Sequence, residues 1–458
     1  MIVIKFGGTS VGDAQRVASA IDIVAARRDR QPVVVVSALA GVTNDLVAAT
    51  EAACAGDQER VREIVARVRQ RHEDVAMQLV QQKFDFFEAF LKKLNRQIDE
   101  IHTILSGIAL LREITARAKD KVVAIGEKLS SVLFTYSLMM RALPGEHVDS
   151  EEVVITDGRF GEASPIMEET REAARRVLVP LLERNLIPVM GGFIGSTREG
   201  ATTTLGRGGS DFSAAIVGAA ISAEEIQIWT DVDGMMTCDP RLIPAAKMIE
   251  RISYVEAAEL AWFGAKVLHP KTIAPAVAEH IPVRILNTHN VSSPGTEITE
   301  EGDASAAGPR AIAVKRGVTI VHMTSNTMLG AHGFLARLFA VFEQLEISVD
   351  LITTSEVSVS VTIDDKHNLQ QLVEKLGPVA NVEVLENQCI VAVVGRDLMR
   401  DSAVGARIFD AVRGVPLSMF SMGTSGLNLS IACSESEGDR AVRAIHAALF
   451  EKHAEVRS

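Results

Sequence analysis

Short apolar runs that end in glycine- or hydroxyl-rich turns constrain the fold of this chain more than any other feature. Ile2 to Phe6 runs into Gly7-Gly8-Thr9-Ser10, and Val33 to Val36 ends at Ser37 in a polar turn that reaches Asn44. Helical periodicity from Val11 to Arg28 separates the two runs. Strand, turn, helix and strand in this order predict a parallel α/β sheet, in which ligands gather at the carboxyl ends of the strands.

The same pattern continues to about residue 300. We predict further strands at Val153 to Thr156, Ile187 to Met190, Ile226 to Trp229 and Val283 to Leu286, the last expected in this domain. Residues 56–120 differ, because apolar side chains recur there every three or four positions and predict a helical insertion. The apolar positions are Phe87, Phe90, Leu91, Leu94, Ile98, Ile101, Leu105 and Ile108. We therefore expect residues 1–300 to form one α/β domain with a mostly parallel sheet between helices.

Beyond an acidic, Gly/Ala/Ser-rich linker at Thr299 to Pro309, a smaller pattern occurs twice. Each copy spans about 70 residues and predicts β-α-β-β-α order, which indicates an internal repeat of small α+β modules. The first copy has Thr319–Met323, Gly333–Leu345, Val349–Thr353, Val357–Ile363 and Asn368–Leu376; the second has Cys389–Val394, Gly405–Val412, Pro416–Ser421, Leu427–Cys433 and Gly438–Phe450. Neither copy holds a cluster typical of catalysis, so we expect both to bind ligands.

Charge and composition limit the partners of the chain. Its 458 residues carry 47 Lys and Arg against 59 Asp and Glu, a formal net charge of −12. This balance disfavours nucleic acid and anionic membranes as partners. The four cysteines lie far apart without C-x-x-C spacing, and we see no apolar run near the ~20 residues that span a bilayer. We predict a cytoplasmic protein.

Two glycine-rich turns carry the residues best suited to anions. Lys5 stands before Gly7-Gly8, which would place an ammonium beside exposed backbone donors and suits a triphosphate. The stretch from Gly200 to Asp211 combines three threonines, glycines, Arg207 and Asp211. Arg207 has the planar fork that binds carboxylate or phosphate, whereas Asp211 either caps the following helix at 213–220 or orients a catalytic cation. A Gly-rich turn with a structural cap is the competing interpretation.

Other nucleotide-binding schemes do not fit. The chain has no Gly-Lys dipeptide, hence no Walker A loop, and no His-Arg-Asp catalytic loop of protein kinases. The glycines at 206 and 208 are followed by Asp211 where G-x-G-x-x-G needs its last glycine, so a dinucleotide site is weakly supported.

Four motifs, in order, resemble those of the aspartokinases, members of the amino acid kinase family. They are Lys5-Phe6-Gly7-Gly8-Thr9-Ser10, Thr203-Thr204-Leu205-Gly206-Arg207-Gly208-Gly209-Ser210-Asp211, Thr230-Asp231-Val232-Asp233-Gly234 and Gly264-Ala265-Lys266-Val267-Leu268-His269-Pro270. The repeated modules resemble ACT domains, so the resemblance covers essentially the whole chain. It implies a catalytic domain at 1–300, a first ACT-like domain at 318–388, and a second one made of 309–317 with 389–458, into which the first is inserted. Ala311 to Lys315 would thus belong to the second module. We expect a monofunctional enzyme, without a homoserine dehydrogenase domain.

The resemblance implies transfer of the ATP γ-phosphoryl group to the β-carboxylate of L-aspartate, with Mg²⁺. The product, 4-phospho-L-aspartate, would begin lysine, threonine and methionine biosynthesis. Carried over by motif, the catalytic residues are Lys5, Arg207, Asp211 and Lys266. The ATP-binding residues are Lys5, Phe6, Gly7, Gly8, Thr230, Asp231, Met236, Arg241, Lys266 and Val267. The aspartate-binding residues are Ser37, Thr43, Glu127, Arg207, Gly208, Gly209, Ser210 and Asp211.

Individual residues keep simpler alternatives. Glu127 would pair with the substrate ammonium or merely complement a helix start, and Arg241 would contact ATP or lie solvated in a turn. His269 before Pro270 is expected to be structural. Met236 stands where many relatives carry a tyrosine beside the adenine. Asp211 would orient the catalytic lysine and the metal, since a carboxylate nucleophile needs no base at neutral pH. No metal ligand is predicted from the protein itself.

Two stretches of the first module, Met328 to Leu335 and Val349 to Glu356, resemble the effector site of lysine-inhibited aspartokinases. The residues that carry this resemblance are Met328, Ala331, Gly333, Phe334, Leu335, Val349, Asp350, Thr354, Ser355 and Glu356. Gly333 would free backbone donors for a carboxylate, and Asp350 or Glu356 would meet a cation. Because Ala331 and His332 replace a hydroxyl and an arginine common in relatives, lysine is the first hypothesis and threonine the second. Such sites form between subunits, which implies a homodimer.

Two alternatives to an aspartate kinase remain. The chain would be another amino acid kinase that acts on glutamate or acetylglutamate, or a non-catalytic amino-acid sensor on a dead kinase fold. The paired modules and Thr43, Glu127 and Arg207 argue against the first, and intact Lys5, Arg207, Asp211 and Lys266 argue against the second.

Overall fold

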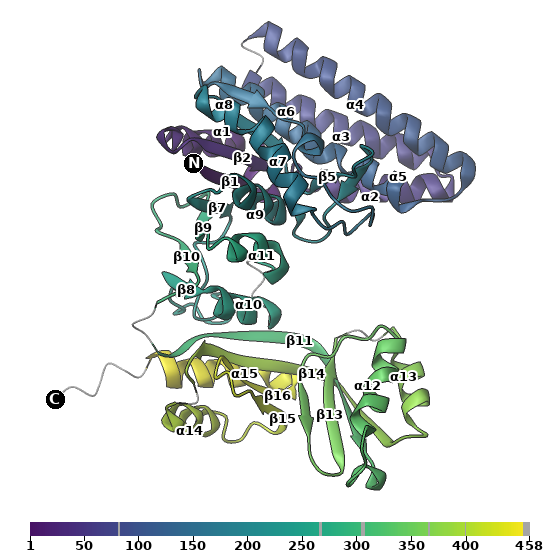
Figure 1. Cartoon of the computed structure of the whole chain (residues 1–458), viewed down its shortest axis with the longest axis vertical. Helices are drawn as coiled ribbons and strands as arrows, with labels where there is room; N and C mark the ends of the chain where they lie inside the picture. The colour runs from purple at the N-terminus through teal and green to yellow at the C-terminus, as the bar shows by residue number, and fades with distance from the viewer. Residues whose placement is uncertain (81–82, 265–267, 304–306, 365–366, 399, 452–458) are drawn as a thin grey trace, which may run out of the picture. The chain divides into compact units, whose positions relative to one another are not determined.

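The computed structural model describes residues 1–80, 83–264, 268–303, 307–364, 367–398 and 400–451. Within these ranges the chain forms two compact units, whose helices and strands are labelled in Figure 1. The first unit contains residues 1–235, 250–254 and 268–302; the second contains 236–249, 255–264 and the described residues from 303 onward. Two short segments from within residues 1–300 therefore pack with the unit that holds the repeat.

An eight-stranded sheet forms the centre of the first unit. Its order is β3-β4-β2-β1-β7-β9-β10-β8, and its pairs are parallel except for β10, which runs antiparallel to β9. The strands are β1 (Ile2–Phe6), β2 (Pro32–Val36), β3 (Gly145–His147), β4 (Ile187–Gly191), β7 (Glu225–Thr230), β8 (Arg251–Ser253), β9 (Val283–Asn287) and β10 (Thr296–Thr299). A separate hairpin joins β5 (Ile194–Ser196) to β6 (Thr202–Thr204). The predicted α/β class is confirmed.

Both faces of the sheet are buried, as expected for a parallel sheet. Ile2, Ile4 and Phe6 lie in a hydrophobic core with the helices of one face, whereas Val3 lies near Gly218 of α9 on the other. The helices on the first face are α1 (Ala14–Ala25), α2 (Val42–Ala55), α3 (Gln58–Val80), α4 (Phe84–Leu111), α5 (Ala116–Val123) and α6 (Ile125–Met140). Helix α9 (Gly209–Ile221) contacts α7 (Met167–Val177) and α11 (Pro270–Ala278), and α8 (Val179–Glu183) precedes β4.

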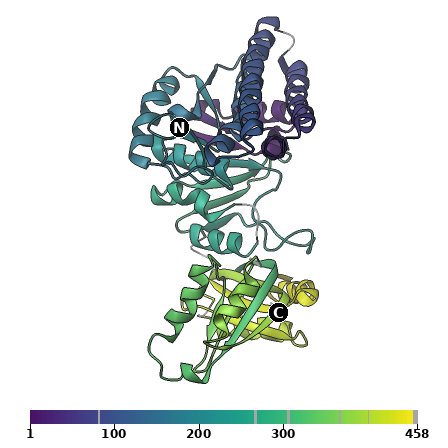
Figure 2. The ribbon, with the colours of Figure 1, turned by 90° about the vertical axis from the view of Figure 1, so that its right-hand side faces the viewer.

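The predicted helical insertion is confirmed. Helices α3 and α4 lie side by side (Figure 1, Figure 2), and the apolar stripe from Phe90 to Ile108 is buried in the main core. One segment, Ala116–Met140, is long and apolar enough to cross a membrane, which the sequence analysis missed. Because 83% of its most apolar window is buried inside the protein, the segment has the character of a core helix.

Two predicted strand assignments are wrong. Val153 to Thr156 is not a strand, because the N–H groups of Val153 and Val154 both donate to Ser150 and continue a short turn. Only isolated bridges follow, at Ile155 and Thr156. Val283 to Leu286 is not the last strand of its sheet, since β10 follows it; β10 has a single aliphatic residue, Ile298, and therefore no recognisable strand pattern.

The second unit contains a six-stranded antiparallel sheet of order β12-β13-β11-β14-β16-β15. The predicted repeat order is confirmed, but β11 and β14 are long strands that pass through both copies and join them into one sheet. The strands are β11 (Gly308–Thr324), β12 (Ile352–Thr354), β13 (Ser358–Ile363), β14 (Asn381–Arg396), β15 (Leu417–Met422) and β16 (Asn428–Ser434). The helices are α12 (Phe334–Gln344), α13 (Leu369–Leu376), α14 (Ser402–Ala411) and α15 (Glu435–His446), and most of α10 (Tyr254–Trp262) also belongs here.

Candidate active site

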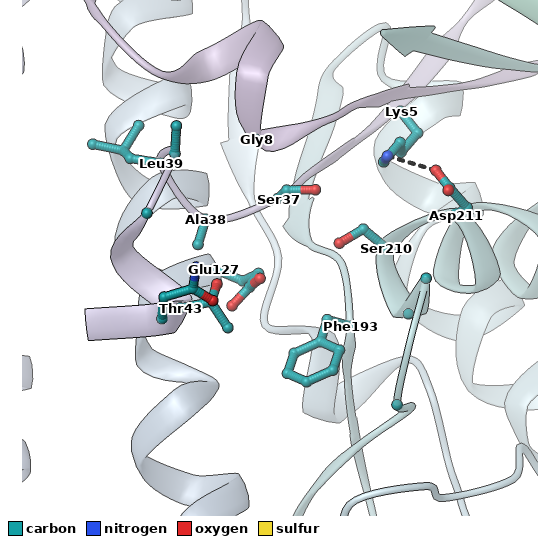
Figure 3. A pocket seen from close by; sticks show the side chains of 16 residues that line it. Lys5, Gly8, Ser37, Ala38, Leu39, Thr43, Glu127, Phe193, Ser210 and Asp211 are labelled. Carbon is teal, nitrogen blue, oxygen red and sulfur yellow. Dashed lines mark ion pairs between the residues drawn. The ribbon is translucent and has the colours of Figure 1, made fainter. Parts of the chain in front are cut away.

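A pocket of about 350 Å³ opens at the carboxyl ends of β1, β2 and β4 in the first unit (Figure 3). This is the edge where the sequence places its glycine- and hydroxyl-rich turns. The lining residues are Lys5, Gly8, Ser37, Ala38, Leu39, Ala40, Gly41, Thr43, Asn44, Glu127, Phe193, Gly206, Gly208, Gly209, Ser210 and Asp211. Four turns that are far apart in the sequence thus meet at one site.

Lys5 and Asp211 form a largely buried ion pair at one end of the pocket. Lys5 is the fourth residue of β1 and only 7% exposed, and its Nζ lies 2.5 Å from Oδ1 of Asp211 in the first turn of α9. The alternative role for Asp211, a helix cap, is wrong: Gly208 occupies the N-cap position at φ 71°, and no side chain caps the helix. The carboxylate instead fixes the position of the lysine ammonium.

Glu127 lies toward the other end of the pocket, near Thr43 (Figure 3). It sits in the first turn of α6, is 4% exposed, and its Oε2 has no hydrogen-bond partner among the described residues. Burial raises the pKa of this carboxyl to about 8, although the backbone N–H groups of Ala38 and Glu127 itself bond to it. A buried carboxylate without a cation is costly, so the site is suited to a ligand that brings an ammonium group.

Two close approaches explain the glycines in the pocket wall. A Cβ on Gly192 would lie 2.7 Å from the Cβ of Ser210, and one on Gly209 would lie 2.5 Å from the ring of Phe193. Any side chain at either glycine would therefore push the 191–193 turn away from the start of α9. Phe193 itself has a left-handed backbone with φ 67°, which is strained for an aromatic residue.

The sequence analysis missed several pocket residues, most notably Phe193, Leu39 and Asn44. The turns that contain them were recognised, but an apolar ring beside two glycines carries no chemical signal of its own. Only the packing of Gly209 against the Phe193 ring reveals that this side chain forms a wall of the site.

The hydroxyl groups of the three threonines before the loop all form hydrogen bonds with other side chains of the protein. The Thr202 hydroxyl donates to Glu151, the Thr203 hydroxyl lies 2.7 Å from that of Thr156, and the Thr204 hydroxyl donates to Asp120 at 2.8 Å. All three side chains are buried. The hydroxyl run therefore anchors β6, while Gly206 and the residues from Gly208 to Asp211 line the pocket.

Several residues of the predicted site lie apart from the pocket lining. The Arg207 side chain is exposed and is not among the described lining residues, and the Phe6 ring is fully buried in the core, so only its backbone could meet a ligand. Gly7 donates its N–H to the carbonyl of Trp229. The Thr230 hydroxyl donates to the exposed Asp231 at 3.2 Å.

The remaining ATP candidates lie in the second unit or outside the described residues. Met236 is half-buried and bridges to Met248, while Arg241 is 86% exposed and binds Asp239 through two nitrogens. Lys266 and Val267 lie outside the described residues. His269, expected to be structural, caps α11: its Nδ1 accepts the N–H of Lys271 at 3.3 Å.

The predicted effector residues surround the start of α12 and the strands β12 and β13 in the second unit. Gly333 occupies the N-cap of α12 at φ 71°, and Ala331, Leu335, Thr354, Ser355 and Glu356 are exposed. Phe334 is buried in the local core, with Met328 and Val349 packed against it. Asp350 already has a cation, since Lys315 Nζ lies 2.7 Å from its Oδ1 and 2.9 Å from Asp364.

Comparison with known proteins gives a consistent result. The amino acid kinase family profile matches residues 1–287, and an ACT domain profile matches residues 321–370 and 391–449. Aspartokinase 3, chloroplastic, of Arabidopsis thaliana is 38% identical over 98% of this chain and 81% of its own length. Lysine-sensitive aspartokinase 3 of Escherichia coli K12 is 37% identical over 98% of this chain and 99% of its own length.

Solved structures agree over the same extent. The E. coli aspartokinase III in complex with aspartate and ADP has a TM-score of 0.85 at 36% identity, covering 98% of this chain and 100% of that chain. The same enzyme in complex with lysine and aspartate has a TM-score of 0.82. Both matches span the two units.

Proposed function

Because the chain belongs to the aspartokinases of the amino acid kinase family, we propose that it transfers the γ-phosphoryl group of ATP to the β-carboxylate of L-aspartate. One observation carries the proposal: a buried lysine fixed by a carboxylate and a buried, unpartnered glutamate line the same small pocket. The glutamate suits the substrate ammonium, and the lysine suits the moving phosphoryl group. The product is 4-phospho-L-aspartate, at the start of lysine, threonine and methionine synthesis.

The two ends of the pocket divide the work. The ammonium of aspartate binds Glu127, and its arrival gives the Oε2 atom a partner and favours the ionised carboxylate. The backbone from Gly208 to Ser210, with Ser37 and Thr43, holds the rest of the amino acid. We include Arg207 as a mobile cation that turns inward to bind the α-carboxylate, since its side chain is exposed and free to reorient.

Phosphoryl transfer itself needs placement and charge neutralisation more than proton transfer. An oxygen of the substrate β-carboxylate bonds to the γ-phosphorus as the bond from that phosphorus to the β,γ-bridging oxygen breaks, and ADP leaves. Lys5 neutralises the transferred group, with Gly7 and Gly8 beside the phosphates, and Asp211 keeps the ammonium in place. No general base is required, because the nucleophile is already ionised at neutral pH.

Mg²⁺ accompanies the nucleotide in this proposal. Among the described residues no group of three or more His, Cys, Asp and Glu side chains could hold a metal, and Asp211 Oδ1 is engaged by Lys5. This donor set fits an ion bound mainly by phosphate oxygens and water, as Mg²⁺ often is. Such an ion would neutralise phosphate charge. Thr230, Asp231, Met236, Arg241, Lys266 and Val267 complete the nucleotide side by family resemblance.

For regulation we propose lysine as the effector, bound at Gly333 and the strands β12 and β13, in a cytoplasmic homodimer formed through the ACT-like domains. The support is the effector motif and the lysine-sensitive E. coli relative. The exposed residues Leu335, Ile352 and Val357 beside this site favour a partner surface. Lysine would compete with Lys315 for Asp350 or use Glu356.

A coupled assay of ADP release tests the proposal directly. We expect turnover with L-aspartate, at least tenfold weaker turnover with L-glutamate, and inhibition by lysine but not by threonine. Turnover with glutamate or acetylglutamate alone would favour the other amino acid kinases, and no turnover with intact ligand binding would favour a sensor.

A further inference from the structure

The loop that forms the substrate side of the pocket is anchored by a carboxylate that does not line the pocket. Asp120, in helix α5, is 2% exposed. Its Oδ2 accepts the backbone N–H groups of Gly161 and Thr204, each at 2.9 Å, and its Oδ1 accepts the Thr204 hydroxyl at 2.8 Å. One side chain thus binds the 157–164 loop and the last residue of β6.

The two segments bound by Asp120 also contact each other, next to the loop that lines the pocket. The carbonyl of Thr204 accepts the N–H of Ala163 at 2.9 Å, and a Cβ on Gly206 would lie 3.3 Å from the Gly161 carbonyl oxygen. Gly206 itself lines the pocket and precedes Gly208, Gly209 and Ser210. The 157–164 loop therefore packs against the start of the pocket loop, and Asp120 fixes the position of both segments.

A buried carboxylate at position 120 has a high desolvation free energy. The donors that contact Asp120 are neutral, and burial raises the pKa of its carboxyl above the ordinary value. A buried ionised group with only neutral donors costs more to desolvate than an amide or a hydroxyl would. In return, each hydrogen bond to an ionised carboxylate is roughly twice as strong as one between neutral groups.

We propose that Asp120 is a positioning residue that sets the affinity for the amino-acid substrate by holding the loop from Gly206 to Ser210. This inference rests on the proposed aspartate kinase function. Asp211 and Lys5 are held by their own ion pair, so loss of the anchor should affect aspartate binding more than phosphoryl transfer. ATP affinity should change little.

The first experiment compares Asp120→Ala with Asp120→Asn. We expect D120A to raise KM for aspartate about tenfold with kcat within about threefold, the pattern of lost binding. D120N should recover KM to within about threefold of the parent, because its amide oxygen can accept the two backbone N–H groups and its NH₂ can donate to the Thr204 hydroxyl. An unchanged KM for aspartate in a folded D120A would overturn the proposal, as would an equal rise in KM for ATP.

A second pair covers the case in which D120A does not fold. Thr204→Val removes only the hydroxyl bound to Asp120, and Thr203→Val removes the equally buried neighbouring hydroxyl bound to Thr156. Both should lower the melting temperature, but only T204V should raise KM for aspartate, by about threefold. Equal KM values in the two variants would overturn the proposal. Absence of aspartate turnover in the parent would instead refute the proposed function itself.

Discussion

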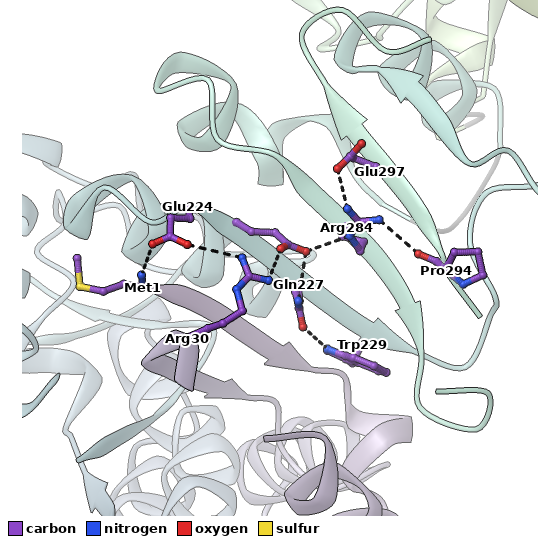
Figure 4. Close-up of polar contacts among 9 residues, drawn as sticks. Met1, Arg30, Glu224, Gln227, Trp229, Arg284, Pro294 and Glu297 are labelled. Carbon is purple, nitrogen blue, oxygen red and sulfur yellow. Dashed lines mark hydrogen bonds and ion pairs between the residues drawn. The ribbon is translucent and has the colours of Figure 1, made fainter. Parts of the chain in front are cut away.

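Two buried glutamates, at opposite edges of the same parallel sheet, show what separates a binding site from a stabilising network. Glu225 begins β7 at the amino edge, and Glu127 lies in the pocket at the carboxyl edge. Glu225 has two arginines: Arg30 at 2.6 Å and Arg284 at 3.0 Å (Figure 4). Glu127 has no ion pair among the described residues, and one of its oxygens is unpartnered.

The two environments shift the pKa values in opposite directions. Burial alone would raise the pKa of Glu225, but hydrogen bonds from Arg30 and Arg284 hold it below the ordinary value. Burial raises the pKa of Glu127 to about 8, and among the described residues only backbone hydrogen bonds from Ala38 and Glu127 oppose this shift. The buried charge at the amino ends of the strands is therefore neutralised by protein side chains, whereas the buried carboxyl at the carboxyl ends needs a cationic ligand.

The network at the amino edge extends well beyond Glu225. Arg284 also donates to Glu297 at 2.6 Å, and the amide of Gln227 links Glu225 to the Trp229 indole through bonds of 3.2 and 3.1 Å (Figure 4). Arg27 lies over the same indole, 4.6 Å from the ring centre. Each polar group here has a protein partner, which favours stability over binding.

The largest expected effect is the loss of Lys5. Lys5→Ala should lower kcat by about 10³-fold, the scale seen when a preorganised charge-stabilising donor is removed. The free energy of unfolding should be affected much less than kcat, since water can hydrate Asp211 in the open pocket once the lysine is gone. Steady-state kinetics and urea unfolding measure the two quantities. Retention of more than a tenth of the parent kcat would show that this end of the pocket does not neutralise the phosphoryl group.

Glu127→Gln tests the other end of the pocket. We expect KM for aspartate to rise by about 50-fold, since a buried charge pair with the substrate ammonium is worth roughly 2–3 kcal/mol. KM for ATP should stay within about twofold. Isothermal titration with aspartate provides a check independent of turnover, and unchanged affinity would mean that the ammonium binds elsewhere.

Some residues of the pocket can be predicted from the sequence, but others, and the Glu225 network, cannot. The strand-and-turn pattern identified Lys5 and the Gly208–Asp211 turn, because charged or glycine residues at strand ends are visible in the sequence. Glu127, in the first turn of a helix, was predicted only from the resemblance to the aspartokinases. The pattern did not identify Phe193 or Asp120, whose roles depend on contacts between residues 16 to 84 positions apart. It also missed the Glu225 network entirely, since charged residues at strand starts resemble ordinary surface residues until their burial is known.

The repeat shows the same limit. Periodicity predicted its ten elements in order, but the fusion of two copies into one sheet depends on β11 and β14 continuing past the predicted strand ends. Exposed polar residues such as Arg316 and Glu386 interrupt the apolar pattern there, and they coincide with register shifts beyond which the pairing of β11 with β14 resumes. Backbone pairing leaves no trace in side-chain periodicity.

Glu225→Gln should lower stability with little effect on the kinetic constants, the opposite of what we expect for the pocket variants. We expect a loss of about 2 kcal/mol in the free energy of unfolding, because Arg30 and Arg284 lose their shared partner in a partly buried site. Both KM values and kcat should stay within about twofold of the parent. Glu63→Gln is the matched control, since the ion pair that Glu63 makes among the described residues is an exposed one with Arg60, and its loss should cost less than about 0.5 kcal/mol. A large change in KM would show that the amino edge also shapes the site.

The smallest expected effect is a difference in the pH dependence of stability. The pKa of Glu127 lies near 8 in the folded protein and near 4.5 in the unfolded chain, so the folded state keeps a proton that the unfolded chain releases. Its contribution to stability is therefore full below pH 4.5 and is lost as the pH rises to 8. Between pH 6 and pH 7 the parent should lose about 1 kcal/mol relative to E127Q, since one proton per pH unit corresponds to about 1.4 kcal/mol.

Glu225 should show the opposite sign in the same measurement. Its pKa is lowered on folding, so its contribution is present above pH 4.5 and is lost as the pH falls through the folded value. The free energy of unfolding of E225Q should therefore change with pH as that of the parent does between pH 6 and pH 7. Its pH dependence should differ from that of the parent only in acid. Urea unfolding of the parent, E127Q and E225Q at pH 4, 6 and 7 separates the two residues. If E127Q and the parent had parallel slopes between pH 6 and pH 7, Glu127 would already be ionised in the empty pocket, and the contrast between the two edges would fail.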